Sequence, residues 1–240
     1  AAGAFLKAAA DAGWEATGVE PNGWLARWGR DRYGVTIHVG SIDTVDLPRR
    51  HFDVVTLWDV IEHTPDPMHV LRRVNDLLVP GGLLIVNYPD IGSWIARALG
   101  RKWPFLSSVH LYYFTRRTIT AALDRSGFDT LVVRPHYQRL KLGYIADRGS
   151  VVSPLLSRVG VTLTTALGLA EREVPYWIGQ TFVAARAADA RQSRRLEGGH
   201  EGHGDAVDKS IRSAGRAAAV LARRRGSAAA TESTQSLGER

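Results

Sequence analysis

An acid and a histidine stand side by side at Glu62-His63, shortly after an apolar run that ends in Trp58-Asp59. Such a cluster could be a catalytic acid–base pair, a metal site or the wall of a pocket. A zinc site needs three or four ligands, and one Glu-His pair in a chain without cysteine supplies only two. Adjacent residues on a turn or helix also point in different directions, which argues against a dyad. We therefore expect a pocket wall without a metal, with His63 facing the substrate.

Polar residues follow each of four apolar segments that have the character of strands. In an open parallel sheet the ligand binds beyond the carboxyl ends of the strands, at the point where the strand order reverses. These residues are therefore the candidates for a binding site. In chain order they are Glu20-Pro21-Asn22, Ser41-Ile42-Asp43, Trp58-Asp59-Val60 and Asn87-Tyr88-Pro89.

Two of the carboxylates at these strand ends suit a nucleoside. Glu20 can accept hydrogen bonds from two adjacent ribose hydroxyls, because a carboxylate presents two oxygens in a fixed fork. The same side chain could equally cap the helix that follows it. Asp43 can accept a hydrogen bond from an exocyclic amine such as that of adenine, or it can be an ordinary turn aspartate. The residue types alone leave these alternatives open.

Strands and helices alternate along most of the chain with short connections. Asn22 is a typical N-cap, and Gly34 is a typical helix terminator. The apolar run that begins at Phe52 is expected of a strand covered on both faces. We predict helices over 4–12, 23–33, 67–78 and 115–126, and strands over 14–19, 35–39, 52–57, 83–86 and 131–133. The alternation predicts an α/β fold with a doubly wound, mostly parallel sheet and helices on both faces.

Composition bounds the class of protein. The chain has 240 residues, 45% of them hydrophobic, a formal charge of +7 and no cysteine, which excludes disulfides and thiolate sites. No apolar run approaches the roughly 20 residues of a spanning helix. Residues 1–10 lack the features of a signal peptide, so we expect a cytoplasmic protein. The core lacks a basic stripe interleaved with aromatic residues, so a nucleic-acid partner is not expected.

The chain divides into a folded part and a tail. We expect one domain over 1–187, with substrate or lid insertions at about 91–110 and 140–175. The insertion segment "SPLLSRVGVTLTTALGLAER" could form a helix with one apolar face, serving as a lid or making peripheral contact with a membrane. Residues 188–240 are rich in Gly, Ser, Ala and Arg, and we expect a low-complexity, disordered tail. Residues 211–225 could alternatively form a basic helix on a partner or membrane surface.

Several segments together resemble the class I S-adenosylmethionine-dependent methyltransferases, especially the small-molecule group that includes ubiquinone-biosynthesis O-methyltransferases. They are "AAGAF", "GVEPN", "GSID", "FDVVTLWDVIEHTPDP", "LLVPGGLLIVNYPD" and "HLYYFTRRTI" followed by "SGF". The late segment "VPYWIGQTFVAARA" is similar to the antiparallel closing strand of that family. The chain departs from the family at its start, where a strand and the leading glycine of the first turn are missing. We therefore expect an N-terminally incomplete domain.

The resemblance implies a place for each part of the cofactor S-adenosylmethionine. The methionine part lies against the first turn, and the ribose and the adenine lie beyond the next two strands. The sulfonium lies beyond the strand that ends at Trp58. The residues are, in that order, Ala1, Ala2 and Gly3; Glu20, Pro21 and Asn22; Ser41, Ile42 and Asp43; and Trp58, Asp59 and Val60.

The resemblance also implies methyl transfer to a small-molecule acceptor. The methyl carbon on sulfonium is already electrophilic, so in-line alignment supplies much of the acceleration. For a hydroxyl acceptor, a base of near-neutral pKa helps to remove the proton, and histidine qualifies. The catalytic candidates are His110, which opens the segment "HLYYF", and His63; either could instead make a structural hydrogen bond. We expect transfer to oxygen.

Two other functions fit part of the pattern. A nucleotide-dependent oxidoreductase also uses an acid after its second strand, although the strand ends "GSID" and "WDVIEH" argue against it. A catalytically inactive methyltransferase fold could serve as a binding module through its basic tail. Nicotinamide absorbance changes would identify the first, and cofactor binding without transfer would identify the second.

Overall fold

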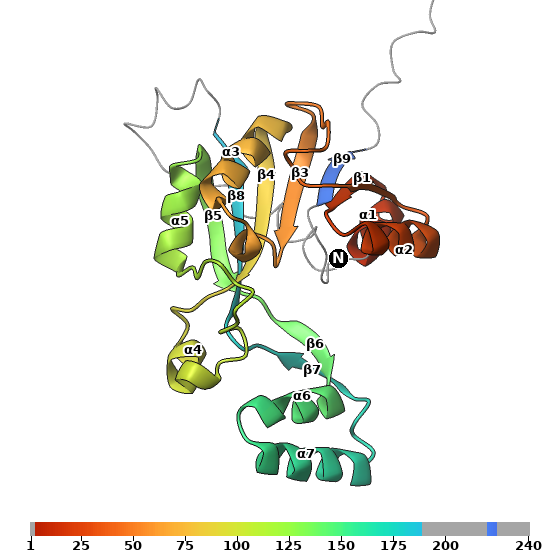
Figure 1. Cartoon of the computed structure of the whole chain (residues 1–240), viewed down its shortest axis with the longest axis vertical. Coiled ribbons are helices and arrows are strands. Elements are labelled where there is room, and N and C mark those ends of the chain that lie inside the picture. Colours follow the sequence, from red (N-terminus) through yellow and green to blue (C-terminus); the bar gives the residue numbers. More distant parts are fainter. Residues whose placement is uncertain (1–2, 189–219, 225–240) are drawn as a thin grey trace, which may run out of the picture.

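The computed structural model describes residues 3–188 and 220–224. Within these residues the main body is a seven-stranded sheet with strand order β2-β1-β9-β3-β4-β8-β5 (Figure 1). Five strands run in one direction, and β8 and β9 run against them. The strands are β1 (Trp14–Glu20), β2 (Thr36–Val39), β3 (Phe52–Trp58), β4 (Leu78–Pro89), β5 (Phe128–Pro135), β8 (Gln180–Ala187) and β9 (Val220–Arg224). The predicted α/β class, with a mostly parallel sheet and an antiparallel closing strand, is confirmed.

Local sequence accounts for the ends of the helices between the strands. Asn22 accepts hydrogen bonds from the first backbone N–H groups of α2, and Gly34 ends that helix with a left-handed φ of 64°. Asp66 caps α3, whose first residue is proline, and Thr115 forms a capping box at the start of α5. The helices are α1 (Ala4–Asp11), α2 (Gly23–Tyr33), α3 (Pro67–Leu77) and α5 (Arg116–Asp124).

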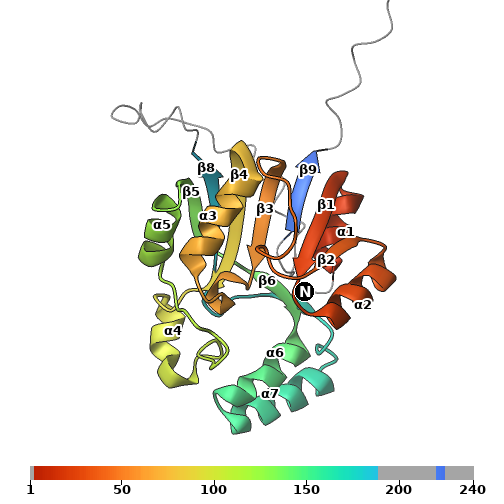
Figure 2. The same ribbon diagram turned by 45° about the horizontal axis from the view of Figure 1, so that its top comes forward.

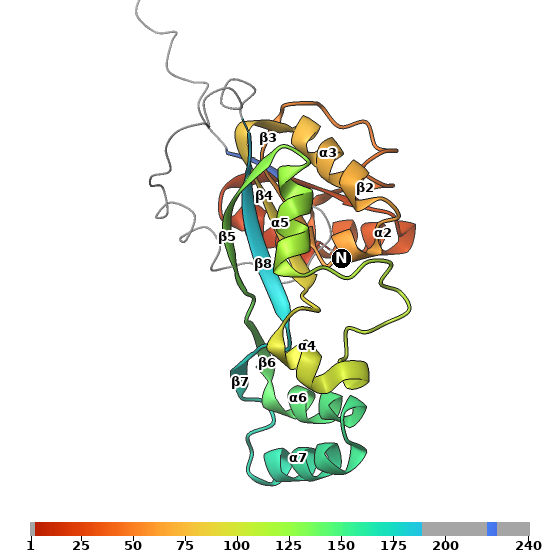
Figure 3. The ribbon, with the colours of Figure 1, turned by 90° about the vertical axis from the view of Figure 1, so that its left-hand side faces the viewer.

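The core lies on both faces of the sheet. One face carries Leu84, Val86 and Tyr88 of β4, which pack with the buried residues of α3 and α5. Both helices lie on the same side of the sheet in Figure 3. On the other face, Trp58 packs with Phe182 of β8 and with Phe5 of α1. Alternate residues of the central strands are therefore buried in opposite directions, which explains their nearly continuous apolar sequence.

The position between β1 and β3 is filled by β9, which is antiparallel to both neighbours (Figure 2). Trp14 pairs with Arg224, and Val54 pairs with Ala222, so the ladder joins residues far apart in sequence. Of the basic helix considered for 211–225, the structure describes only 220–224, and these form a strand instead. The other residues of the predicted tail beyond Ala188 lie outside the described part.

The two predicted insertions lie beyond the carboxyl ends of the parallel strands, at the lower end of the molecule in Figure 1. The first contains α4 (Trp94–Leu99) and the 3-10 turn η2 (Gly100–Lys102). The second, residues 138–176, is called the helical module here. It contains β6 (Gln138–Lys141), α6 (Leu142–Arg148), the 3-10 turn η3 (Gly149–Val151), α7 (Pro154–Ala166) and β7 (Glu173–Tyr176), and β6 and β7 form their own two-stranded sheet. No helix in the described ranges is long and apolar enough to cross a membrane.

Candidate functional site

The turn before α1 is closely packed around Gly3. This residue has φ 83°, a left-handed value that favours glycine. A Cβ atom at this position would lie 3.1–3.4 Å from side-chain atoms of Val35, Ile37 and Tyr33. The turn therefore has no room for a larger residue, and it brings backbone N–H groups to the start of α1, as the predicted cofactor turn requires. Ala1 and Ala2, predicted to belong to the same turn, lie outside the described residues.

Glu20 ends β1, as predicted, and its side chain is half-buried. One carboxylate oxygen accepts the backbone N–H of Asn22 at 2.9 Å, and Asn22 in turn caps α2. A carboxylate offers about four lone-pair positions, so this contact leaves capacity for ribose hydroxyls. The helix cap considered for Glu20 is supplied by Asn22 instead, and the ribose contact of Glu20 stays a prediction. Pro21 beside it is exposed.

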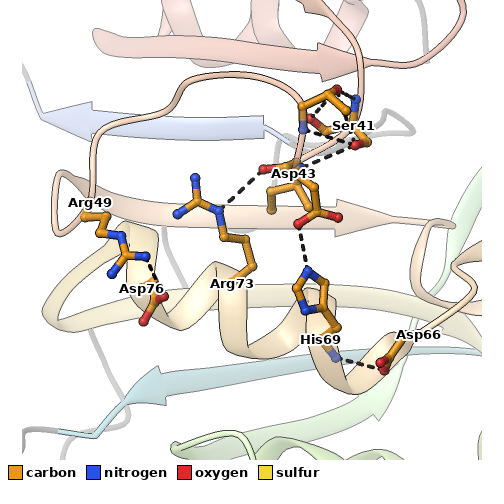
Figure 4. Close-up of polar contacts among 9 residues, drawn as sticks. Ser41, Asp43, Arg49, Asp66, His69, Arg73 and Asp76 are labelled. Carbon is orange, nitrogen blue, oxygen red and sulfur yellow. Dashed lines mark hydrogen bonds and ion pairs between the residues drawn. The ribbon is translucent and has the colours of Figure 1, made fainter.

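The loop after β2 is held by its own side chains and by α3 (Figure 4). The Ser41 hydroxyl lies 3.3 Å from the backbone nitrogen of Asp43, and the Ile42 carbonyl lies 3.5 Å from Nε of Arg73. Asp43 itself lies 2.8 Å from Nε2 of His69, and both side chains are about half exposed. The sequence alone did not suggest His69 as a partner. Asp43 is therefore anchored to α3 through one carboxylate oxygen.

Asp59 joins three strands at the carboxyl edge of the sheet. Its φ of 51° is unusual for a residue other than glycine and is held by the surrounding contacts. Oδ1 accepts a hydrogen bond from the Asn87 side-chain amide at 2.7 Å and another from that of Gln180 at 3.0 Å. Gln180 was missed in the sequence because it begins β8, far along the chain. These two hydrogen bonds fix the direction of the Asp59 carboxylate.

The residues on either side of Asp59 belong to the core. Trp58 is 5% exposed, and its ring lies 5.6 Å from the ring of Phe5 in α1 and 5.6 Å from that of His136. Its indole nitrogen has no hydrogen-bond partner among the described residues. Val60 is half-buried against the main core. Trp58 thus supports α1 and the turn at Gly3, while Asp59 alone of this group points its polar atoms along the sheet edge.

Glu62, His63 and His110 form a cluster that the fold assembles from two distant segments. Their ligand atoms all lie within 4.8 Å of one another, and the two imidazole rings are 4.7 Å apart. Glu62 and His63 lie on the 3-10 turn η1 (Ile61–His63). The Glu62 carbonyl accepts backbone N–H groups of Leu111 at 2.8 Å and Tyr112 at 3.2 Å, which holds the His110 segment in place.

Backbone contacts orient both imidazoles in the same way. Nδ1 of His63 lies 2.9 Å from the Val109 carbonyl, and Nδ1 of His110 lies 2.7 Å from the Phe105 carbonyl. Because a carbonyl oxygen only accepts, each Nδ1 carries the hydrogen, and Nε2 of the neutral ring is left with its lone pair. Each ring therefore presents Nε2 as the atom that can take a proton or bind a metal.

Burial shifts the titration of this cluster. Glu62 is 1% exposed, and Oε2 has no hydrogen-bond partner among the described residues. The pKa of Glu62 is raised to about 8, chiefly by burial; a backbone hydrogen bond opposes this rise and the negative charge of Asp59 adds to it. Burial also lowers the pKa of His110, partly offset by the Phe105 carbonyl. Near neutral pH the cluster thus combines a largely protonated acid with a neutral imidazole.

The structure changes the assessment of the Glu62-His63 pair. The argument that adjacent residues point in different directions does not separate this pair, because a carboxylate oxygen of Glu62 and a ring nitrogen of His63 lie within 4.8 Å of each other. His110 supplies the third group that the sequence argument lacked. Carboxylate and imidazole are ligands for zinc and other transition metals. The sequence argument expected no metal because only two ligands were visible. The structure brings three together, and Glu62, expected only to line a pocket, is one of them.

Comparison with known proteins identifies the family. A family described as a methyltransferase domain matches residues 1–133. The ubiquinone biosynthesis O-methyltransferase of Cereibacter sphaeroides is 30% identical over 120 residues, 43% of this chain and 49% of that protein. Its namesake from Ruegeria pomeroyi is 30% identical over 92 residues, 32% of this chain and 37% of that protein. The chain thus matches about half or less of the length of these curated relatives.

A solved structure shows the same fold. A chain from the Haloferax volcanii complex between the Trm112 methyltransferase activator and a methyltransferase aligns with a TM-score of 0.51 at 12% identity, covering 72% of each chain. The family match extends over more than half of the 240 residues. With the sheet order and the polar strand ends described above, it establishes that the chain belongs to the class I S-adenosylmethionine-dependent methyltransferases.

Proposed function

We propose that this methyltransferase transfers a methyl group from S-adenosylmethionine to a hydroxyl group of a small molecule, with His110 as the general base. The observation that carries the proposal is the pair of imidazoles, each held through Nδ1 by a backbone carbonyl, with their rings 4.7 Å apart beside the buried Glu62. A small-molecule acceptor is supported by the names of the ubiquinone biosynthesis O-methyltransferase relatives. An oxygen acceptor is supported by the presence of a base, which a hydroxyl needs more than a neutral amine does.

The cofactor would bind along the carboxyl edge of β1, β2 and β3. The tight turn at Gly3 suits the methionine part, since its left-handed φ of 83° and its close packing against Val35 and Ile37 hold the start of α1 in place. Glu20 would bind the ribose hydroxyls, and the loop at Asp43 would flank the adenine. Asp59 would stand nearest to the sulfonium. The residues assigned from the resemblance remain the proposed contacts: Ala1, Ala2, Gly3, Glu20, Pro21, Asn22, Ser41, Ile42, Asp43, Trp58, Asp59 and Val60.

The residues of the cluster would then handle one proton. Nε2 of His110 takes the hydroxyl proton while the acceptor oxygen forms its bond to the methyl carbon and the carbon–sulfur bond breaks. The products are the methylated acceptor, S-adenosylhomocysteine and a protonated His110. The ring of His63 lies 4.7 Å from that of His110 and borders the same site. A lowered pKa keeps His110 neutral, and therefore basic, at neutral pH.

A second candidate is a metal-assisted form of the same reaction. Glu62, His63 and His110 fit a divalent cation in number and type, and the unpaired, buried Oε2 of Glu62 is the observation that favours it. When bound, such an ion would lower the pKa of the acceptor hydroxyl. The chain's own residues would then hold the ion, and neither histidine would serve as the base.

Transfer of a labelled methyl group to a panel of phenols, catechols and sugars tests the proposal. His110→Asn should lower kcat by about 100-fold or more while leaving the Kd for S-adenosylmethionine unchanged. His38→Asn on β2 is the matched control and should retain activity, because His38 is exposed and away from the cluster. Full activity of the His110 variant would refute its role as base.

Two further arms separate the rival functions. Loss of transfer on chelation, with recovery on adding zinc or manganese, would replace the base by the metal-assisted form. Cofactor binding without transfer to any acceptor would identify a binding module. A change in nicotinamide absorbance on turnover would identify an oxidoreductase.

A further inference from the structure

The apolar side of α7 faces outward. Five residues on this side are between 49% and 71% exposed. Leu155, Val159 and Leu163 follow one another at intervals of four residues, which places them on one face of the helix. Leu167 continues this series just past the end of α7. We call them the leucine face: Leu155, Leu156, Val159, Leu163 and Leu167.

The opposite side of α7 is small and polar, and it is the side that packs inward. Ser157 is buried, and its hydroxyl donates to the Asp147 carbonyl of α6 at 3.2 Å. A Cβ atom at Gly160 would lie 3.3 Å from the Ala146 side chain, so the two helices approach closely along this line. Thr164 is half-buried and bonds to its own helix. The usual polarity of a surface helix is thus reversed, which indicates that the leucine face has an apolar partner outside the helical module.

The chain itself offers little to cover this face. Outside the described ranges, residues 189–219 and 225–240 contain no aromatic residue. Leu196, Val207, Ile211 and Leu237 are their only branched aliphatic residues. These segments consist mainly of Ala, Gly, Ser, Arg and acidic residues. They lack the apolar side chains needed to bury a row of leucines.

A second copy of the chain is also a poor match in area. A helix of 13 residues is about 20 Å long and presents a strip of about 10 Å width. The strips of two copies added together are still well below the roughly 800 Å² that each single partner buries in a standard stable interface. A lipid surface has no such requirement, because it accepts an apolar strip of any length.

The charges beside the leucine face favour an anionic surface. From Arg148 to Ala170 the charged residues are Arg148 and Arg158, and there is no Asp or Glu. The neighbouring insertion contributes more positive charge, since Ile91 to Thr115 contains Arg97, Arg101 and Lys102 without an acid. The two segments touch: Nζ of Lys102 donates to the Val152 carbonyl, just before α7, at 3.2 Å.

We propose that the leucine face of α7 docks on an anionic lipid surface, with α7 lying in the plane of the interface. The basic residues of both insertions would contact the headgroups, and the leucines would enter the acyl boundary. Trp94, 67% exposed on α4 at the same end of the molecule, suits the headgroup level (Figures 1 and 2). Both insertions lie beyond the carboxyl edge of the sheet, so docking would hold the site against the membrane.

Vesicle co-sedimentation of the full 240-residue chain tests the proposal. The wild type should bind vesicles of phosphatidylcholine with phosphatidylglycerol, and less so vesicles of phosphatidylcholine alone. Leu155→Gln/Leu163→Gln should lower the bound-to-free ratio by about tenfold or more, because the burial of two leucine side chains in the lipid is lost. Leu131→Gln on β5 is the matched control, an exposed leucine outside the module, and should bind as the wild type does.

A second variant, Arg148→Gln/Arg158→Gln, removes the charges and keeps the leucines. It should lose the preference for anionic vesicles. Unchanged melting temperatures would show that the exposed substitutions leave the fold intact. Absence of binding to either vesicle, or equal loss in the Leu131 control, would overturn the proposal. A dimer in sedimentation that the double leucine variant converts to monomer would instead assign the face to a second copy.

Discussion

Burial of the Glu62 carboxyl makes folding depend on pH. In water this group has a pKa near 4.5, and in the folded chain it is raised to about 8. Below the lower value both states are protonated and the group does not affect stability. Between the two values the unfolded state releases a proton that the folded state keeps, so stability falls as the pH rises toward 8. Above that value no further loss occurs.

Glu62→Gln removes this titration while keeping the shape of the side chain. The variant should gain about 2–4 kcal/mol of unfolding free energy relative to the wild type between about pH 5 and about pH 8. Urea unfolding at both pH values, with chelator present, measures the difference. Glu15→Gln, exposed on β1, is the control and should show no such gain. If the unfolding free energies of the wild type and of Glu62→Gln changed in parallel with pH, the Glu62 carboxyl would not be held protonated in the folded chain.

Glu20 tests the proposed ribose contact separately from catalysis. Glu20→Ala should weaken S-adenosylmethionine binding by about 1–3 kcal/mol, because hydrogen bonds to a charged acceptor are lost. Calorimetric titration measures this change, and Glu15→Ala on the same strand should bind as the wild type does. Unchanged affinity would leave Glu20 with a structural role only, as the acceptor of the hydrogen bond from the backbone N–H of Asn22.

The helical module can be tested as a unit, because its two strands leave and rejoin the main sheet side by side. Arg139 pairs directly with Pro175, so the residues between them can be replaced by an Asn-Gly turn of two residues. If the module shapes the acceptor site, the shortened chain should still fold and bind S-adenosylmethionine. Its turnover should fall by about 100-fold or more, as expected from loss of acceptor positioning.

Single-turnover transfer with labelled cofactor measures the effect of this deletion. Leu155→Gln/Leu163→Gln, in which the module is intact, should retain turnover on a water-soluble acceptor. Unchanged turnover of the shortened chain would show that the acceptor is bound by the sheet edge and α4 instead. Loss of cofactor binding would show that the module is part of the cofactor site.

At the level of elements, the ends of helices could be predicted where a capping or terminating residue close in sequence determines them. The cap at Asn22 and the terminator Gly34 lie where the sequence places them, because each satisfies backbone groups of its own helix. The strand predicted to start at residue 83 begins at Leu78 in the structure. Pro80-Gly81-Gly82 is typical of a break between elements, but a register shift between β3 and β4 accommodates these residues within the strand.

At the level of the molecule, residues brought together from distant segments were the hardest to predict. The carboxyl-edge positions of Glu20, Asp43 and Asp59 follow from strand order alone. The partner of Asp59 at Gln180, the partner of Asp43 at His69 and the approach of His110 to Glu62 depend on tertiary packing that has no local signature. For the same reason β9 had no counterpart in the predicted strands.

The placement of β9 has a consequence for the order of events during synthesis. Strands β1 and β3 have no ladder to each other and are bridged by a segment about 200 residues after the first of them. Closing so long a loop is entropically slow, and the two halves of the sheet have no ladder between them until residues 220–224 have been synthesised and paired. The unpaired edges of β1 and β3 are exposed during that interval, so they are the part of the partly folded chain most open to pairing with other molecules.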